Sequence, residues 1–106
     1  QIPYEPSGLM VGWGDIRAQT RKTMDNLLLA IEALGGSMDD FVKTNVSITD
    51  PQMIPAFFGE YEKYFTTPYP AMTIAGTGLA QDCMVIEIEA IAVTGASRNA
   101  TVVVDR

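Results

Sequence analysis

The sequence contains no histidine, and its one cysteine is Cys83. Without histidine the chain cannot form a Ser-His-Asp triad, a Cys-His dyad or a zinc site that uses histidine. A lone cysteine excludes an internal disulfide framework, and Cys83 has no cationic neighbour in the sequence that would activate its thiol. We therefore expect neither a metal nor a cofactor, and few familiar catalytic groups remain available.

Basic residues are also few, because seven Lys and Arg oppose thirteen Asp and Glu for a net charge of −6. Cations scattered singly along a chain form no basic stripe that could neutralise phosphates or an anionic lipid surface. No apolar run approaches the roughly 18 residues of a membrane span, and the first residues lack the pattern of a signal peptide. We expect a cytoplasmic protein that binds neither nucleic acid nor membranes.

At 106 residues the chain has room for one domain with a single core. A domain of this size buries roughly 60 to 70% of the surface that its unfolded chain exposes. We therefore expect a deep ligand site to take some of its walls from another subunit.

The clearest local pattern is an amphipathic helix that begins after Asp15 and ends at Gly35 and Gly36. Asp15 can cap the first free amides, and the glycine pair can supply a left-handed stop. Apolar residues recur at helical spacing between these ends, at Ile16, Met24, Leu27, Leu28, Ile31 and Leu34. Charged residues for which we expect solvation occupy the opposite face, at Arg17, Arg21, Lys22 and Asp25.

Residues 41–48 alternate with a period of two, which predicts a strand. The alternation places one set on the core face, namely Val42, Thr44, Val46 and Ile48. It places the other set on the opposite face, namely Phe41, Lys43, Asn45 and Ser47.

The pair Asp50-Pro51 then predicts a second helix over about 52–65, with an aromatic stripe along it. Acidic neighbours such as Glu60 and Glu62 disfavour phosphates. We therefore interpret the stripe as core packing and not as a platform for stacked bases.

The sequence predicts two further strands, over 71–80 and 84–94, and we expect them to pair in antiparallel fashion. The second strand places Ile86, Ile88, Ala90 and Ala92 on one face and Val85, Glu87, Glu89, Ile91 and Val93 on the other. A half-buried sheet in a monomer shows a polar outer face, whereas this second face mixes apolar residues with two carboxylates. We therefore expect another subunit to cover it.

Several stretches between residues 14 and 92 follow one another in a characteristic order. They read Gly14-Asp-Ile-Arg-Ala-Gln-Thr-Arg-Lys-Thr-Met-Asp-Asn-Leu27, Ala33-Leu-Gly-Gly36, Asp40-Phe-Val-Lys-Thr44, Ser47-Ile-Thr-Asp50, Tyr61-Glu-Lys-Tyr-Phe65, Tyr69-Pro-Ala71 and Ile86-Glu-Ile-Glu-Ala-Ile-Ala92. In order and spacing they resemble the Rid family, the YjgF-like reactive intermediate deaminases. The resemblance implies an α+β fold like that of chorismate mutase, with a mixed sheet backed by two helices. It further implies a homotrimer in which the sheet faces pack together and ligand clefts lie at the interfaces.

The resemblance implies a family domain over residues 1–94 and a C-terminal extension over 95–106. Gln1 resembles the Gln of the family's Ser-Gly-Gln-Ile-Pro segment, which follows a first hairpin. We expect the chain to be a fragment of a longer protein that carries this hairpin. The alternative is that a strand over 101–105 substitutes for part of it, and a short strand is also expected around 9–11.

The family's imine deaminases have Pro-Ala-Arg where this chain has Pro70-Ala71-Met72. Those enzymes add water to a 2-imino or 2-enamino acid and release ammonia. A guanidinium holds a substrate carboxylate with two parallel hydrogen bonds and a charge, which Met72 cannot supply. Asparagine is common in the family where this chain has Phe58, in the helix that borders the cleft. The resemblance therefore implies a more apolar pocket, unsuited to a simple substrate such as 2-iminopropanoate.

Glu87 matches the family's carboxylate that holds the hydrolytic water, and it is the catalytic residue that we predict. We expect Met72 and Ile74 beside it, where they would partly desolvate the carboxylate and suit it to act as a general base. The alternative is that Glu87 pairs with a cation such as Lys43 across the trimer. We interpret Glu89 as an interface or rim charge.

The predicted substrate-binding residues are Met72, Thr73, Ile74 and Phe58, with backbone amides near Thr73 available to polarise an imine. We predict a hydrolase that releases ammonia from an enamine or imine, such as an intermediate of aromatic or heterocycle breakdown. The alternative is a trimer that binds a small metabolite without catalysis, which the change from Arg to Met favours. An endoribonuclease, a role known among such relatives, would require basic clefts that an acidic chain does not offer.

Overall fold

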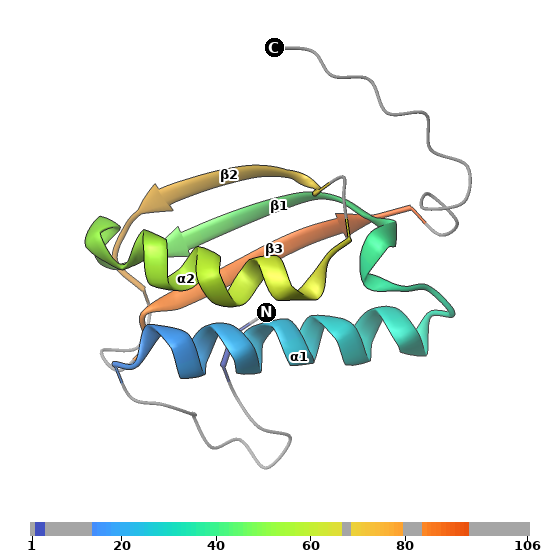
Figure 1. Cartoon of the computed structure of the whole chain (residues 1–106), viewed down its shortest axis with the longest axis horizontal. Coiled ribbons are helices and arrows are strands. Elements are labelled where there is room, and N and C mark those ends of the chain that lie inside the picture. Colours follow the sequence, from blue (N-terminus) through green and yellow to red (C-terminus); the bar gives the residue numbers. More distant parts are fainter. Residues whose placement is uncertain (1, 4–13, 67–68, 80–83, 94–106) are drawn as a thin grey trace.

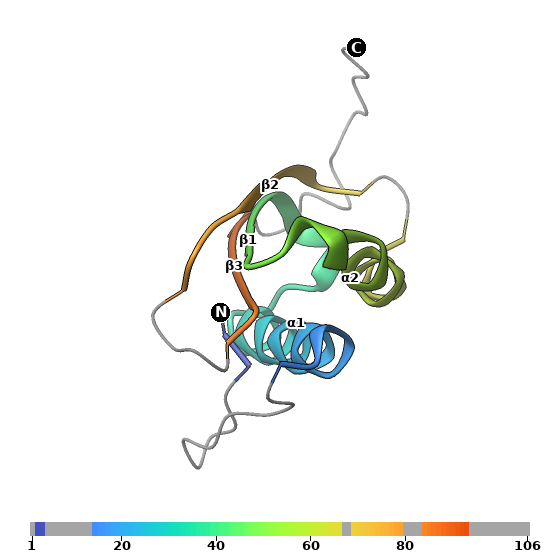
Figure 2. The same cartoon turned by 90° about the vertical axis from the view of Figure 1, so that its left-hand side faces the viewer.

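In the computed structural model, residues 2–3, 14–66, 69–79 and 84–93 are described. Helices α1 (Ile16–Ala33) and α2 (Ile54–Tyr61) pack on one face of a three-stranded sheet (Figures 1 and 2). The strands are β1 (Phe41–Ile48), β2 (Ala71–Gly76) and β3 (Ile86–Ala92). Three short 3-10 turns connect them, at Met38–Asp40, Pro51–Met53 and Glu62–Tyr64. The α+β class and the mixed sheet backed by two helices are therefore confirmed, whereas the strands expected around 9–11 and 101–105 lie outside the described residues.

Helix α1 begins and ends where the sequence predicts. The Asp15 carboxylate accepts hydrogen bonds from the backbone N–H groups of Arg17 and Ala18, at 3.0 and 3.2 Å. After the helix, Gly35 adopts a φ of 81°, the left-handed conformation that a residue without Cβ takes at least cost. Leu34 departs from the predicted apolar stripe, because it follows the last helical residue and is 75% exposed.

One 3-10 turn precedes helix α2 and another follows it. The chain is therefore helical from Pro51 to Tyr64, although the type of helix changes along the way. The Asp50 carboxylate caps the first turn by accepting from the N–H of Gln52 at 2.9 Å. Pro55 lies in the first turn of α2, where its missing N–H costs no hydrogen bond. The predicted helix and its role in the core are confirmed.

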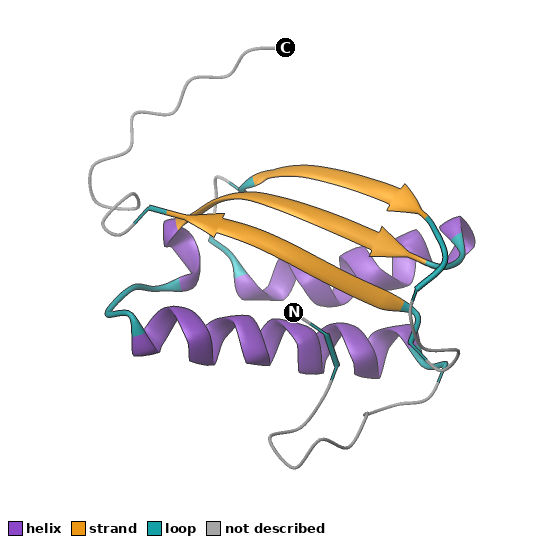
Figure 3. Cartoon of the chain, turned by 180° about the vertical axis from the view of Figure 1, so that it is seen from behind, coloured by secondary structure: helices purple, strands orange, loops and turns teal. Residues whose placement is uncertain are grey.

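The strand order is β2-β1-β3, with β1 parallel to β2 and antiparallel to β3 (Figure 3). The predicted antiparallel pairing of the last two strands is therefore wrong. The backbone N–H of Val85, just ahead of β3, donates to the buried side chain of Gln19 on α1 at 2.8 Å. The N–H of Thr77, just after β2, donates instead to the Ile48 carbonyl. The first bond ties the start of β3 to α1, and the second continues the pairing of β2 with β1.

The first residues of β1 reverse the predicted faces. Phe41 is buried in the core and Val42 is 41% exposed, whereas alternation along the strand predicted the opposite. The cause is a shift in the pairing with β3 between Phe41 and Lys43, because Phe41 lies opposite Ala92 and Lys43 lies opposite Ile91. An extra residue at such a bulge moves the preceding side chain to the other face.

The sheet thus has two distinct faces. The face toward the helices is apolar, with Thr44, Val46, Ile48, Ile86 and Ile88 buried and Met72 and Ile74 packed against the core. We call the other face the outer face, and it carries Lys43, Asn45, Ser47, Ala71, Thr73, Ala75, Glu87, Glu89 and Ile91. The predicted division of the last strand into an apolar face and a mixed face is confirmed over Ile86–Ala92, whereas Val85, assigned to the mixed face, is buried.

Among the described residues, no helix is long and apolar enough to cross a membrane.

Candidate functional site

The predicted site residues lie on both faces of the sheet. Glu87 on β3 and Thr73 on β2 belong to the outer face, whereas Met72 and Ile74 pack toward the helices. Strand β1 lies between Glu87 and the β2 residues. The expectation that Met72 and Ile74 flank Glu87 is therefore wrong within one chain. Sequence alternation could not show this, because it does not say which strands are neighbours.

Three rows of side chains cross the outer face from β3 through β1 to β2. The first row joins Glu87, Ser47 and Ala75, and the second joins Glu89, Asn45 and Thr73. Directly paired residues on neighbouring strands place their side chains about 5 Å apart. The two rows therefore bring two carboxylates, two hydroxyls and one amide within reach of one small molecule or water.

The third row joins Ile91, Lys43 and Ala71. It is less polar than the other two, and Ile91 is 55% exposed. Glu87 is half-buried, whereas Glu89 is exposed. Of the two carboxylates, Glu87 is thus the one with the more protected surroundings.

Phe58 borders the sheet on its helix side. Its ring lies 5.8 Å from the ring of Tyr61, and the Tyr61 hydroxyl lies 2.9 Å from the hydroxyl of Thr44. Thr44 in turn is the β1 partner of Met72. Phe58 and Met72 therefore lie on the same side of the sheet and are linked through two buried side chains. Burial raises the pKa of Tyr61, and its hydrogen bond with Thr44 opposes that rise.

A further aromatic residue, Tyr69, joins this group and was not predicted from the sequence. Its ring centroid lies 6.3 Å from that of Phe58, and it precedes β2 by two residues. In the sequence Tyr69 stands between two prolines in a stretch that indicates only a stiff loop. An aromatic residue directly ahead of a predicted strand was the available signal.

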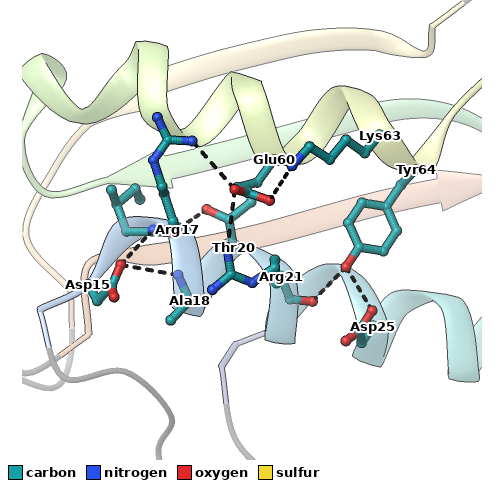
Figure 4. A network of polar contacts seen from close by, with 10 residues as sticks. Asp15, Arg17, Ala18, Thr20, Arg21, Asp25, Glu60, Lys63 and Tyr64 are labelled. Carbon is teal, nitrogen blue, oxygen red and sulfur yellow. Dashed lines mark hydrogen bonds and ion pairs between the residues drawn. The ribbon is translucent and has the colours of Figure 1, made fainter.

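A cluster of charges joins the two helices (Figure 4). The carboxylate of Glu60 on α2 is almost fully buried, and three cations contact it: Arg17 at 3.4 Å, Arg21 at 3.2 Å and Lys63 at 3.2 Å. The hydrogen bond from Lys63 is the main cause that lowers the pKa of Glu60, and the arginines reinforce it against the effect of desolvation. Arg17, Arg21 and Asp25 are exposed, as predicted for the charged face of α1, but the contacts of the two arginines with Glu60 were not predicted.

Tyr64 extends this cluster to the next turn of α1. Its hydroxyl lies 2.7 Å from the Asp25 carboxylate and 3.1 Å from the Arg21 carbonyl oxygen. Burial raises the pKa of Tyr64, and the Asp25 carboxylate raises it further. The cluster is best explained as a joint between α1 and the helical stretch Pro51–Tyr64, because every one of its contacts links these two segments or lies within one of them.

The described residues include no group of three or more Cys, Asp or Glu side chains placed to hold a metal ion.

These features define an α+β domain with two helices on one face of a mixed sheet and a polar outer face that carries two carboxylates. Residues 1–94 match the family model described as Endoribonuclease L-PSP, and the chain belongs to this family, which includes the YjgF and RidA proteins. The resemblance noted in the sequence is thereby confirmed.

Two curated relatives illustrate the similarity. The chain is 35% identical over 96 residues to the 2-iminobutanoate/2-iminopropanoate deaminase of Escherichia coli, covering 88% of this chain and 74% of that protein. It is 34% identical over 92 residues to a RutC family protein of Pyrococcus horikoshii, covering 87% of this chain and 73% of that protein.

Solved structures agree with the fold. The YjgF gene product of E. coli superposes with a TM-score of 0.79 at 35% identity, covering 88% of this chain and 75% of that one. RidA from an Antarctic Psychrobacter gives a TM-score of 0.78 at 30% identity, covering 87% and 74%.

Proposed function

We propose that this chain is a RidA-like hydrolase that releases ammonia from a small enamine or imine and does not depend on a substrate carboxylate. The observation that carries the proposal is the placement of Glu87, half-buried on the outer face and paired with Ser47. It is supported by the 35% identity to a deaminase of 2-imino acids.

In the proposed reaction Glu87 acts as a general base toward a water molecule. It takes a proton from the water while the water oxygen bonds to the imine carbon, and it passes this proton to the imine nitrogen to give an amino alcohol. Glu87 then moves the hydroxyl proton to the same nitrogen as the C–N bond breaks and the C=O bond forms, so that one imine and one water yield one carbonyl compound and one ammonia. Positioned proton transfer of this kind contributes about 10²- to 10⁴-fold in rate. Backbone amides near Thr73 would polarise the C=N group.

The proposed substrate class rests on Met72. A guanidinium at this position would bind a carboxylate bidentately, whereas a thioether offers neither charge nor N–H donors. Ile74 and Phe58 add further apolar surface on the same side of the sheet. A substrate whose carboxylate is absent or held elsewhere suits these side chains better than a 2-imino acid.

The proposal includes a homotrimer with the site between subunits. In one chain Glu87 and Met72 lie on opposite faces and on strands separated by β1. A second subunit packed against the outer face would cover Ile91 and Val93, each 55% exposed, and could bring its own β2 edge to Glu87. The site would then be complete only in the assembly.

A non-catalytic trimer that binds a small metabolite is the second candidate, and the loss of the arginine at Met72 favours it. Endoribonuclease activity, the name of the family, is less well supported. The net charge is −6, and Arg17, Arg21 and Lys63 already contact Glu60. A nuclease requires cations free to neutralise phosphates.

Four imines formed in situ would test the proposal. An amino-acid oxidase supplies those of phenylalanine and leucine, and an amine oxidase supplies those of the decarboxylated counterparts, 2-phenylethylamine and 3-methylbutylamine. We expect the chain to accelerate ammonia release over spontaneous hydrolysis, and to favour the two imines without a carboxylate.

Glu87→Gln should lower the acceleration by about 100-fold or more, since it removes the base. Glu89→Gln on the same strand is the matched control and should retain the rate within a few-fold. A mass of three chains in solution should accompany activity. Tight binding of such compounds without ammonia release would favour the non-catalytic trimer, and a strictly monomeric yet active chain would contradict the interfacial site.

A further inference from the structure

Phe58 and Tyr69 form a pair of partly exposed aromatic rings. Phe58 is on α2 and Tyr69 lies just ahead of β2, yet their centroids are 6.3 Å apart with the planes inclined by 65°. Phe58 is 37% exposed and Tyr69 is 43% exposed. Each ring thus contacts the other in a favourable edge arrangement and still presents aromatic surface outward.

Buried aromatic rings support both members of the pair. Phe58 lies against Phe57 and Tyr61, with centroids 6.5 and 5.8 Å away, and Tyr69 lies 6.3 Å from Phe65. These three supporting rings are buried in the core. Rings held in this way lose little conformational freedom when a ligand binds, which reduces the entropic cost of binding.

Other large apolar side chains are exposed without such an arrangement. Leu29 and Leu34 are more exposed than either ring, but they lie at separate points of the α1 segment and take part in no ring contact. Single exposed apolar residues are ordinary on protein surfaces. The pair differs because its rings are matched in geometry and lie on the same side of the sheet as Met72, through Tyr61 and Thr44.

We propose that Phe58 and Tyr69 form one wall of the substrate pocket and select substrates whose imine or enamine carries an aromatic substituent. The inference rests on the proposed function and assigns Tyr69 as a specificity-determining residue. A third ring would continue the contacts that the protein's own rings make at centroid distances of 4.9 to 6.5 Å. An aliphatic group of similar size gains the apolar contact without the ring geometry.

The same four imines separate the effect of the aromatic group from the effect of the carboxylate. The imines of 2-phenylethylamine and 3-methylbutylamine both lack a carboxylate, and those of phenylalanine and leucine both carry one. Within each pair only one member has an aromatic ring. Each contact between two aromatic rings strengthens binding by about threefold to tenfold beyond the effect of the buried area. We therefore expect kcat/KM for the aromatic imine to exceed kcat/KM for the aliphatic imine by about tenfold. The ratio should be similar with and without the carboxylate.

Tyr69→Leu and Phe58→Leu retain apolar bulk but remove a ring. Each should lower the aromatic-to-aliphatic ratio of kcat/KM by about threefold or more, because the aromatic imine loses a ring contact that the aliphatic imine does not make. Leu29→Ala is the control for removal of an exposed apolar side chain, and it should leave the ratio unchanged. Mass measurements on each variant separate a change in selectivity from a loss of assembly.

A binding experiment keeps this inference apart from the proposed reaction. Phenylacetamide and 3-methylbutanamide are stable, uncharged analogues, and calorimetry should show tighter binding of phenylacetamide, a preference that Tyr69→Leu reduces by about threefold. That result without ammonia release would refute the proposed reaction and retain the aromatic wall. The aromatic wall would be refuted if aromatic and aliphatic compounds reacted equally fast and bound equally tightly. It would also be refuted if the variants changed only the assembly of the subunits and not the selectivity.

Discussion

The hydroxyl groups of Thr44 and Tyr61 lie 2.9 Å apart, in a part of the core where both side chains are fully buried. This contact joins the central strand β1 to helix α2, and the Tyr61 ring that it fixes packs against the ring of Phe58. The energetic importance of the pair can be measured without touching any residue of the proposed site.

Tyr61→Phe removes one hydroxyl and leaves the buried Thr44 hydroxyl without its partner. We expect a loss of about 1–3 kcal/mol in the free energy of unfolding, because a buried polar group without a hydrogen bond carries its desolvation penalty. Urea unfolding checks this. The double variant Thr44→Val with Tyr61→Phe should cost less than the two single changes summed, since no unpaired hydroxyl remains. Strict additivity would show that the two hydroxyls do not interact.

Glu60 should make stability depend on pH in the acid range. Its pKa in the folded protein is lowered from 4.5, with the hydrogen bond from Lys63 as the largest cause. A carboxyl group whose folded pKa is depressed stabilises the protein at pH values above its unfolded pKa. That stabilisation is lost as the pH falls from about 4.5 through the lower folded value.

Melting temperatures of the chain and of Glu60→Gln, followed from pH 7 to pH 3, test this expectation. The variant should be less stable at pH 7, and the difference should shrink below about pH 4.5 as the native carboxylate becomes protonated. Glu62→Gln changes an exposed neighbour and should follow the parent curve. A constant difference between the parent and Glu60→Gln at all pH values would exclude the charge as its cause.

Gln19 should control the anchoring of β3. Its side-chain oxygen accepts the buried N–H of Val85 at 2.8 Å, across 66 positions of the sequence. Gln19→Leu keeps a side chain of similar size but leaves that N–H without this acceptor, at an expected cost of about 1–3 kcal/mol. Hydrogen exchange should show earlier loss of protection at Val85 than at the β1 amides. Gln52→Leu, at an exposed site, is the control, and unchanged protection at Val85 in Gln19→Leu would contradict the anchoring role.

The local features of the fold were predictable because each depends on residues close together in the sequence. The N-cap at Asp15 and the left-handed Gly35 bound α1, and Asp50-Pro51 starts the second helical stretch. The alternation over 86–92 assigns Glu87 and Ile88 to opposite faces. The bulge at the start of β1 escaped prediction, since Phe41 and Val42 are both apolar and the sequence does not show which of them faces the core.

The resemblance to the Rid family marked Glu87, Met72 and Phe58 as candidates, and the chemistry of a carboxylate, a thioether and an aromatic ring indicated what each can bind. Their mutual arrangement required the fold. Which strands flank β1, and hence that Glu87 and Met72 lie apart in one chain, depends on contacts between distant segments such as Gln19 and Val85.

The amino-acid sequence by itself determined the helices, the alternation of the strands and the scarcity of cations, since these depend on local periodicity and composition. Only the tertiary structure decided that the Glu60 carboxylate collects three cations and that Tyr69 meets Phe58. The physical reason is the same in both cases. Burial and ring contacts arise where helices and strands that are distant in the sequence pack together, and the local sequence around a side chain does not show which distant residue it will contact.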